Sequence, residues 1–168
     1  MSLSYFSPAP RPANERERQR AVDESGILRA PPDPTLHQLV ASVAKLLEVP
    51  VAGISIIDRD RMWFAARIGI HELEASRAIS FCAYAILNPH EPLIIPNAIE
   101  DDRFEGNPFV HHGLRFYAGM PVLGKNGLPI GALFGADMKP RQKPVPLTTL
   151  ARLAHRASQA IAEIESQH

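Results

Sequence analysis

The sequence predicts an α+β domain in which an antiparallel sheet is covered by helices. Two hairpin-like segments, residues 51–69 and 115–138, show strand patterns around turn-prone residues. Two apolar stripes with helical spacing lie at residues 34–47 and 147–164. The order helix, hairpin, irregular middle, hairpin, helix brings the strands into one sheet and collects the helices on one face of it.

Length and composition indicate one globular domain. The chain has 168 residues, which suffices for one hydrophobic core. Residues 1–13 carry three prolines and no periodicity, so we expect a flexible or extended N-terminal arm there. We expect residues 14–168 to form the single domain.

Charge and cysteine usage exclude several function classes. The net charge is zero and 45% of the residues are apolar, so neither a nucleic acid nor a membrane is an expected partner. A basic run at 139–156 lacks interleaved aromatic residues, which indicates a solvated surface. The longest apolar run is far below the roughly 18 to 20 residues that cross a bilayer. One cysteine and no secretion signal favour a cytoplasmic location.

The first helix is predicted from alternating acids and bases after Asn14, a suitable N-cap, with Gly26 as its stop. We expect this helix to be short, peripheral and solvated. Asp33 and Pro34 begin the second helix. Its apolar stripe consists of Leu36, Leu39, Val40, Val43, Leu46 and Leu47.

The strands follow from β-branched runs and alternation. "VAGISIID" is apolar throughout, which is typical of a strand buried on both faces, and "MWFAARIG" alternates after the turn "DRDR". "RFYAGMPVL" and "LPIGALFGADM" form the second hairpin around Asn126-Gly127. Bulges or close backbone approach are expected at Gly119, Pro121, Gly131 and Gly135.

The middle of the chain, residues 70–114, is irregular. It holds a short helix around Cys82, the strand-like "PLIIP" and a polar, aromatic stretch, and we interpret it as a binding loop. The last helix carries an apolar stripe that covers the sheet or pairs with a second copy. Its members are Leu147, Leu150, Leu153, Ala157, Ile161 and Ile164.

Several motifs in order resemble the GAF domain family, of the type found in bacterial sensor histidine kinases and diguanylate cyclases. They are "ISIIDRDRMWFAARIGI", "ISFCAYAIL", "LIIPNAIEDDRFEGNPFV", "LRFYAGMPVL" and "GLPIGALFGADMKPR". The resemblance implies a six-stranded antiparallel sheet between helical layers and a small-molecule pocket roofed by the middle segment. It also implies a homodimer through the terminal helices and an output kinase or cyclase module.

The sequence departs from these relatives at positions that bind ligands. Tyr84 stands where many have histidine, and Phe134 where many have cysteine. The "NKFDE" motif of cyclic-nucleotide-binding GAF domains and the Cys-His pattern of bilin attachment are absent. The resemblance therefore leaves the cofactor unnamed.

Eight residues are candidates for the pocket, and most of them serve equally well as core residues. Phe134 interests us most, because its ring could fill the space that a ligand occupies in relatives. The candidates are Phe81, Cys82, Asn97, Arg103, Phe104, Phe109, Phe116 and Phe134.

Arg103 and the histidines have structural interpretations beside the functional ones. Asp101 and Asp102 flank Arg103, which favours a local salt bridge over an anionic ligand. Adjacent His111 and His112 diverge in either a strand or a helix, so we predict no metal site.

Cys82 could serve as a nucleophile only with a base such as His111 or His112 nearby. Its neighbours are apolar, which favours packing at the pocket. GAF-type free methionine sulfoxide reductases use several cysteines, and this chain has one. We therefore predict no catalytic residue.

The leading interpretation is a non-catalytic GAF sensor or regulatory domain that binds a small ligand or partner. One alternative is a thiol-dependent enzyme that uses Cys82. Another is an interaction scaffold in which Phe134 plugs the pocket and the stripe of the last helix binds a partner.

Overall fold

A six-stranded antiparallel sheet of order β3-β2-β1-β6-β5-β4 forms the centre of the protein. The structure is a computed structural model and describes residues 6–167. The predicted fold class is confirmed. The strands are β1 (Val51–Asp58), β2 (Arg61–Ile68), β3 (Glu74–Ser76), β4 (Leu93–Ile95), β5 (Phe116–Leu123) and β6 (Pro129–Asp137).

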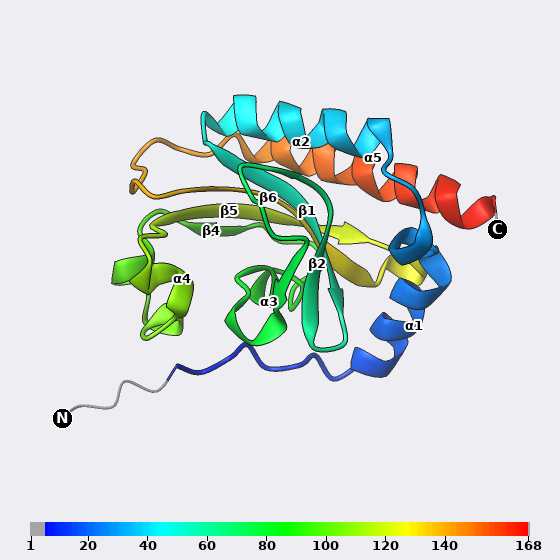
Figure 1. Cartoon of the computed structure of the whole chain (residues 1–168), viewed down its shortest axis with the longest axis horizontal. Coiled ribbons are helices and arrows are strands. Elements are labelled where there is room, and N and C mark those ends of the chain that lie inside the picture. Colours follow the sequence, from blue (N-terminus) through cyan, green and yellow to red (C-terminus); the bar gives the residue numbers. More distant parts are fainter. Residues whose placement is uncertain (1–5, 168) are drawn as a thin grey trace.

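Helices cover both faces of the sheet (Figure 1). The two long helices, α2 and α5, lie side by side on one face, whereas the irregular middle segment with α3 covers the other, so the helices are not all collected on one face as their order suggested. None of the helices within residues 6–167 is both long and apolar enough to span a membrane. The helices are α1 (Glu15–Ser25), α2 (Pro34–Leu47), α3 (Cys82–Ala85), α4 (Pro108–His111) and α5 (Leu147–Ser166).

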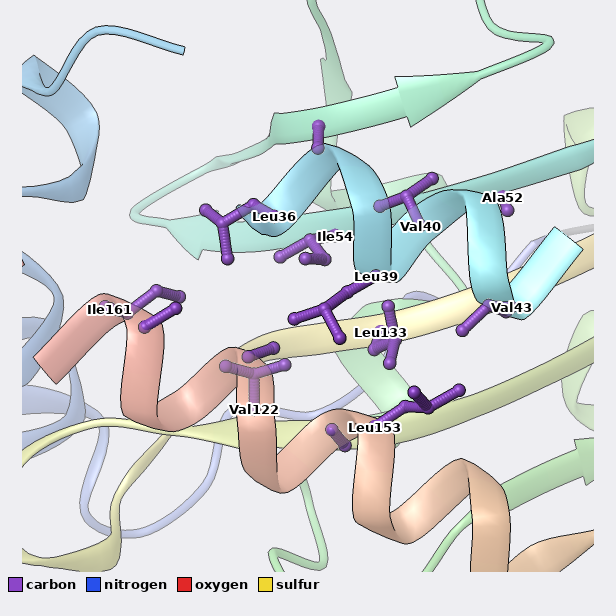
Figure 2. Packing of buried hydrophobic residues seen from close by; sticks show 14 of the residues in the cluster. Leu36, Leu39, Val40, Val43, Ala52, Ile54, Val122, Leu133, Leu153 and Ile161 are labelled. Carbon is purple, nitrogen blue, oxygen red and sulfur yellow. The ribbon is translucent and has the colours of Figure 1, made fainter. Parts of the chain in front are cut away.

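Helix α2 begins and packs as its sequence predicts. The Asp33 carboxylate accepts hydrogen bonds from the N–H groups of Thr35 and Leu36, at 2.8 and 3.2 Å. Figure 2 shows the apolar side chains of α2 facing Ile54 of β1 and Leu133 of β6. All predicted stripe residues are buried except Leu46, which is half-buried.

The apolar stripe of helix α5 packs inside the domain. Its members from Leu150 to Ile164 are buried beneath the helix, and only Leu147, 48% exposed, remains accessible. The stripe covers the sheet and α2 and is not available to a second protein. The scaffold hypothesis that assigned partner binding to this stripe is therefore wrong.

The β5–β6 hairpin shows the backbone features that its sequence predicts. Asn126 and Gly127 have φ values of 61° and 72°, so the turn uses the left-handed conformations that these residues tolerate. Gly131 brings β6 against β1, because a Cβ at this position would overlap the carbonyl oxygen of Ser55. The register of β5 and β6 shifts between Val122 and Leu123.

The outer edge of β5 is only partly paired. Strand β4 pairs with Tyr117–Gly119 and stops there. Beyond that point Pro121 has no N–H group, and the N–H of Leu123 donates to Ser158 Oγ of α5 at 2.9 Å. The free half of β5 is thus closed by a proline and a helix hydroxyl.

Helix α1 is not the solvated helix that its charges suggested. Gly26 ends it in the left-handed conformation, as predicted, but Asn14 makes no side-chain cap. Arg18 is completely buried, and its Nη2 donates to the carbonyl oxygen of Ile57 at 2.8 Å. Among the alternating charged residues, Arg18 points inward because α1 packs on β1 and β6.

Glu15 joins Arg18 to the segment that leads into α3. Its carboxylate accepts from Arg18 at 2.7 Å and from Arg77, itself buried, at 2.9 and 3.0 Å. Burial raises the pKa of Glu15, but the hydrogen bonds from Arg77 and Arg18 together hold this pKa below its usual value. The three residues therefore form a charged junction between α1, the sheet and the middle segment.

Residues 6–13 form no helix or strand and lie along the middle segment (Figure 1). The Tyr84 hydroxyl donates to the carbonyl oxygen of Ser7 at 3.2 Å, and Arg11 pairs with Asp60. The described part of the arm thus contacts the domain at two places. Residues 1–5 of the predicted arm lie outside the described residues.

Candidate functional site

A cavity of about 220 Å³ lies between the sheet and the middle segment. It opens on the face opposite to α2 and α5, where the sequence places its irregular loop. The lining is almost wholly apolar. It consists of Val51, Met62, Phe64, Gly69, Ile70, Glu72, Phe81, Cys82, Phe109, Leu114, Tyr117, Phe134, Ala136 and Met138.

Aromatic rings form much of the cavity wall. The rings of Tyr117 and Phe134 stack with centroids 5.7 Å apart and planes 15° apart. Phe81 lies 5.5 Å from Tyr117, and Phe64 lies 6.2 Å from Phe134, both tilted. These four rings come from β2, β5, β6 and the residue before α3, so one surface joins the sheet to the middle segment.

Two glycines make room for these rings. A Cβ on Gly119 would overlap the Tyr117 hydroxyl, and a Cβ on Gly53 would lie 3.0 Å from the Phe134 ring. Phe134 therefore lies against β1 instead of filling the cavity. A cavity remains beside this ring, so Phe134 does not fill the pocket as the scaffold alternative predicted.

The wall contains a hydrogen bond between the Cys82 thiol and the Tyr117 hydroxyl, at 3.1 Å. Both side chains are buried. Burial raises the pKa of Cys82 to about 11 and raises the pKa of Tyr117 well above its usual value. Both groups are therefore neutral at neutral pH.

Ser80 fixes the position of Cys82. Its Oγ accepts a hydrogen bond from the N–H of Ala83 in the first turn of α3, at 3.1 Å. The same hydroxyl contacts Met62 Sδ on β2 at 3.0 Å. The thiol is thus held at the start of α3 against the sheet.

The structure brings together half of the predicted pocket residues. Phe81, Cys82, Phe109 and Phe134 line the cavity. Phe104 lies behind this wall, where its ring stacks on Phe81 with centroids 3.9 Å apart.

Asn97 and Arg103 lie outside the cavity lining. Asn97 accepts from the N–H of Ile99 and so caps a short turn. Arg103 donates to Asp101 at 2.9 and 2.6 Å, and these hydrogen bonds lower the pKa of the Asp101 carboxyl. The local salt bridge favoured from the sequence is present.

Phe116 was predicted to line the pocket, but it lies on the face of the sheet opposite to the cavity. It packs in the core beneath α2 and α5, whereas the next residue, Tyr117, points into the cavity. Successive residues of a strand alternate between faces, so only one of this pair can reach the pocket. The signal that could have identified Tyr117 is Gly119 two residues later on the same face.

The remaining lining residues were not predicted individually. Val51, Met62, Phe64 and Ala136 come from strands whose patterns indicated only burial. Glu72, Leu114 and Met138 come from connections near the strand ends, where no motif marks them.

The environment of Cys82 does not support thiol chemistry. Cys82 is buried, whereas the proposed bases His111 and His112 are exposed. No group of three His, Cys, Asp or Glu side chains suited to a metal ion occurs within residues 6–167.

Alkylation of Cys82 by iodoacetamide is expected to be at least about 100-fold slower at pH 7 than that of a free cysteine, because only the thiolate reacts. A pKa near 11 also means that the rate rises about tenfold per pH unit up to that value. Mass spectrometry measures the labelled fraction over time, with urea-unfolded protein as control. Equal rates in folded and unfolded protein contradict this expectation and would restore the nucleophile hypothesis.

Comparison with known proteins identifies the fold and a related sequence. Residues 31–161 match the GAF domain family. A cyclic di-GMP phosphodiesterase of Pseudomonas aeruginosa is 37% identical over 159 residues, covering 94% of this chain but only 27% of that protein. The chain thus spans about a quarter of the length of this relative.

Two solved structures show the same fold at low sequence identity. The GAF domain of an Acinetobacter phosphoenolpyruvate-protein phosphotransferase is 17% identical, with a TM-score of 0.63, over 90% of this chain and 94% of that one. The free methionine-R-sulfoxide reductase of Neisseria meningitidis, in complex with its substrate, is 15% identical, with a TM-score of 0.62, over 99% of both chains. The fold thus occurs both as one domain of a larger protein and as an enzyme that acts on a small molecule.

Proposed function

The chain belongs to the GAF domain family, and from this premise we propose that it is a non-catalytic sensor domain whose cavity binds a small molecule. One observation carries the proposal: an apolar cavity of about 220 Å³ lies between the sheet and the middle segment. Phe134 leaves this space open by lying over Gly53, which supports a sensor over a plugged scaffold. The neutral, buried Cys82 thiol supports a binding role over a thiol-dependent enzyme.

A ligand would act by differential affinity for two packings of the middle segment. Tyr117 lies in the cavity wall, and its neighbours Phe116 and Ala118 lie in the core beneath α2 and α5. Movement of β5 at the cavity would therefore be transmitted to the long helices through adjacent residues of one strand.

The output of the domain would lie in a separate module. The cyclic di-GMP phosphodiesterase relative is much longer than this chain, so its matching part is combined with other sequence. We propose that this domain likewise regulates an enzymatic output module of bacterial signalling, such as a kinase, a cyclase or a phosphodiesterase.

We further propose that two copies associate through their terminal helices. The buried stripe of α5 is excluded from this contact, so the outer surface of the helix, with exposed Leu147 and Ala162, would supply it. Native mass spectra at increasing protein concentration report the fraction of dimer, and a persistent monomer of about 18.5 kDa contradicts the association.

Native and denaturing mass spectra of the freshly purified protein test the sensor proposal. We expect a mass excess in the native spectrum that is lost on denaturation. Ala136, buried in the cavity wall, is then replaced by leucine, which fills part of the space. The affinity of Ala136→Leu for the ligand is expected to fall roughly tenfold, because the ligand and the added side chain compete for the same space at a cost on the order of 1–3 kcal/mol.

Ala41→Leu provides the matched control, since Ala41 is exposed on α2, on the other side of the sheet. This variant is expected to keep the full mass excess. A bare wild-type protein, or an equal excess in Ala136→Leu, would overturn the proposal.

A further inference from the structure

We infer that the cavity selects a neutral, planar aromatic ligand that presents one hydrogen-bond acceptor to the Tyr117 hydroxyl. The inference rests on the proposed sensor function and names the chemical class that the site takes. Three properties of the wall carry it: the aromatic rings, the distribution of charge and the partner of the Tyr117 hydroxyl.

The rings favour a flat ligand. Tyr117 and Phe134 present nearly parallel faces, with Phe81 and Phe64 tilted on either side. Aromatic surfaces of this kind bind another ring by offset stacking or by edge-to-face contact. The volume of about 220 Å³ is smaller than the roughly 300–1,000 Å³ of pockets for drug-sized molecules, so one or two rings fit.

The charges of the wall exclude anions. Of the lining residues, Glu72 is the single acidic side chain, and Arg, Lys and His are missing from the lining. Arg103 pairs with Asp101 outside the cavity. A phosphate or carboxylate in this space would lose its hydration without gaining a cation, which is a large cost in an apolar site.

The Tyr117 hydroxyl can donate a further hydrogen bond. Its partner in the structure is the Cys82 sulfur at 3.1 Å, and a thiol is a weak acceptor but also a donor. If the thiol donates to the Tyr117 oxygen, the hydroxyl proton is free for a better acceptor. A ring nitrogen or a carbonyl oxygen on the ligand would supply one, while both protein groups stay neutral.

Three probes that share a fused two-ring frame test the inference by ligand-observed NMR titration: quinoline, naphthalene and quinoline-2-carboxylate. Quinoline has a ring nitrogen as acceptor, naphthalene has none, and the third probe is an anion. We expect quinoline to bind about three- to tenfold more tightly than naphthalene, which is the effect of one net hydrogen bond. The anion is expected not to bind.

Tyr117→Phe removes the hydroxyl and is expected to bring the ratio between quinoline and naphthalene to about one. Tyr84→Phe is the matched control, since the Tyr84 hydroxyl bonds Ser7 outside the cavity lining, and it should keep the wild-type ratio. Ala136→Leu should weaken both neutral probes alike.

The outcomes separate this inference from the sensor proposal. Tight binding of the anion, or an unchanged ratio in Tyr117→Phe, overturns the ligand class while a loss of binding in Ala136→Leu still supports the cavity as a binding site. Binding of all three probes that is unaffected by Ala136→Leu counts against the cavity itself, and with it against both proposals.

Discussion

Gly131→Ala is expected to abolish the folded state. Gly131 lies in β6, which is paired on both sides, and its added Cβ would overlap the backbone oxygen of Ser55 in β1. A backbone atom cannot rotate away, so the strands must separate and lose part of their ladder. Effects above about 4–5 kcal/mol are exceptional for one substitution. This one falls in that range and approaches the whole stability of a typical domain, about 5–15 kcal/mol.

Circular dichroism during urea unfolding measures the effect, and Gly127→Ala is its control. Gly127 undergoes the same chemical change, but nothing lies within 4 Å of its Cβ position. Its cost is that of a positive φ, about 1 kcal/mol. A Gly131→Ala protein with a cooperative transition close to that of Gly127→Ala would show that β1 and β6 do not approach as described.

Arg18→Met is expected to lower the free energy of unfolding by about 3–5 kcal/mol, the range found when one partner of a buried ion pair is removed. Methionine keeps the length of the side chain but leaves the Ile57 carbonyl oxygen without this donor. It also leaves Glu15 with a single arginine partner. The loss therefore arises from an unsatisfied carbonyl oxygen and a weakened pairing of Glu15 rather than from a cavity.

Arg16→Met is the matched control, because Arg16 is exposed on the same helix. Its effect should stay within about 0.5 kcal/mol. Urea unfolding of both variants at pH 7 gives the comparison. Equal stabilities for the two variants would mean that the Arg18 contacts contribute nothing, contrary to its complete burial.

The sequence predicts those elements whose signals are local. Helix α2 carries its cap and its stripe within one segment, and the turn at Asn126-Gly127 needs only the two residues that form it. Strand β3 escapes prediction because three residues are too few to show alternation. The burial of Arg18 depends on carbonyl groups 39 and 111 residues away, which no local pattern reveals.

The pocket is predictable in outline and not in detail. The aromatic residues of the middle segment predict that it covers a buried surface of the sheet. Four predicted residues do line the cavity there: Phe81, Cys82, Phe109 and Phe134. Which ring faces the cavity depends on strand register, and a shift of one residue exchanges Phe116 for Tyr117. Register was not fixed by the residues of β5 alone, since every one of its side chains is at least half-buried.

The closed edge of β5 also limits how this protein can assemble. A strand that approached Pro121 and Leu123 would find no free N–H group at either residue, so this half of β5 is a poor template for pairing with a strand of another molecule. Association of two copies through this stretch of β5 is therefore not expected.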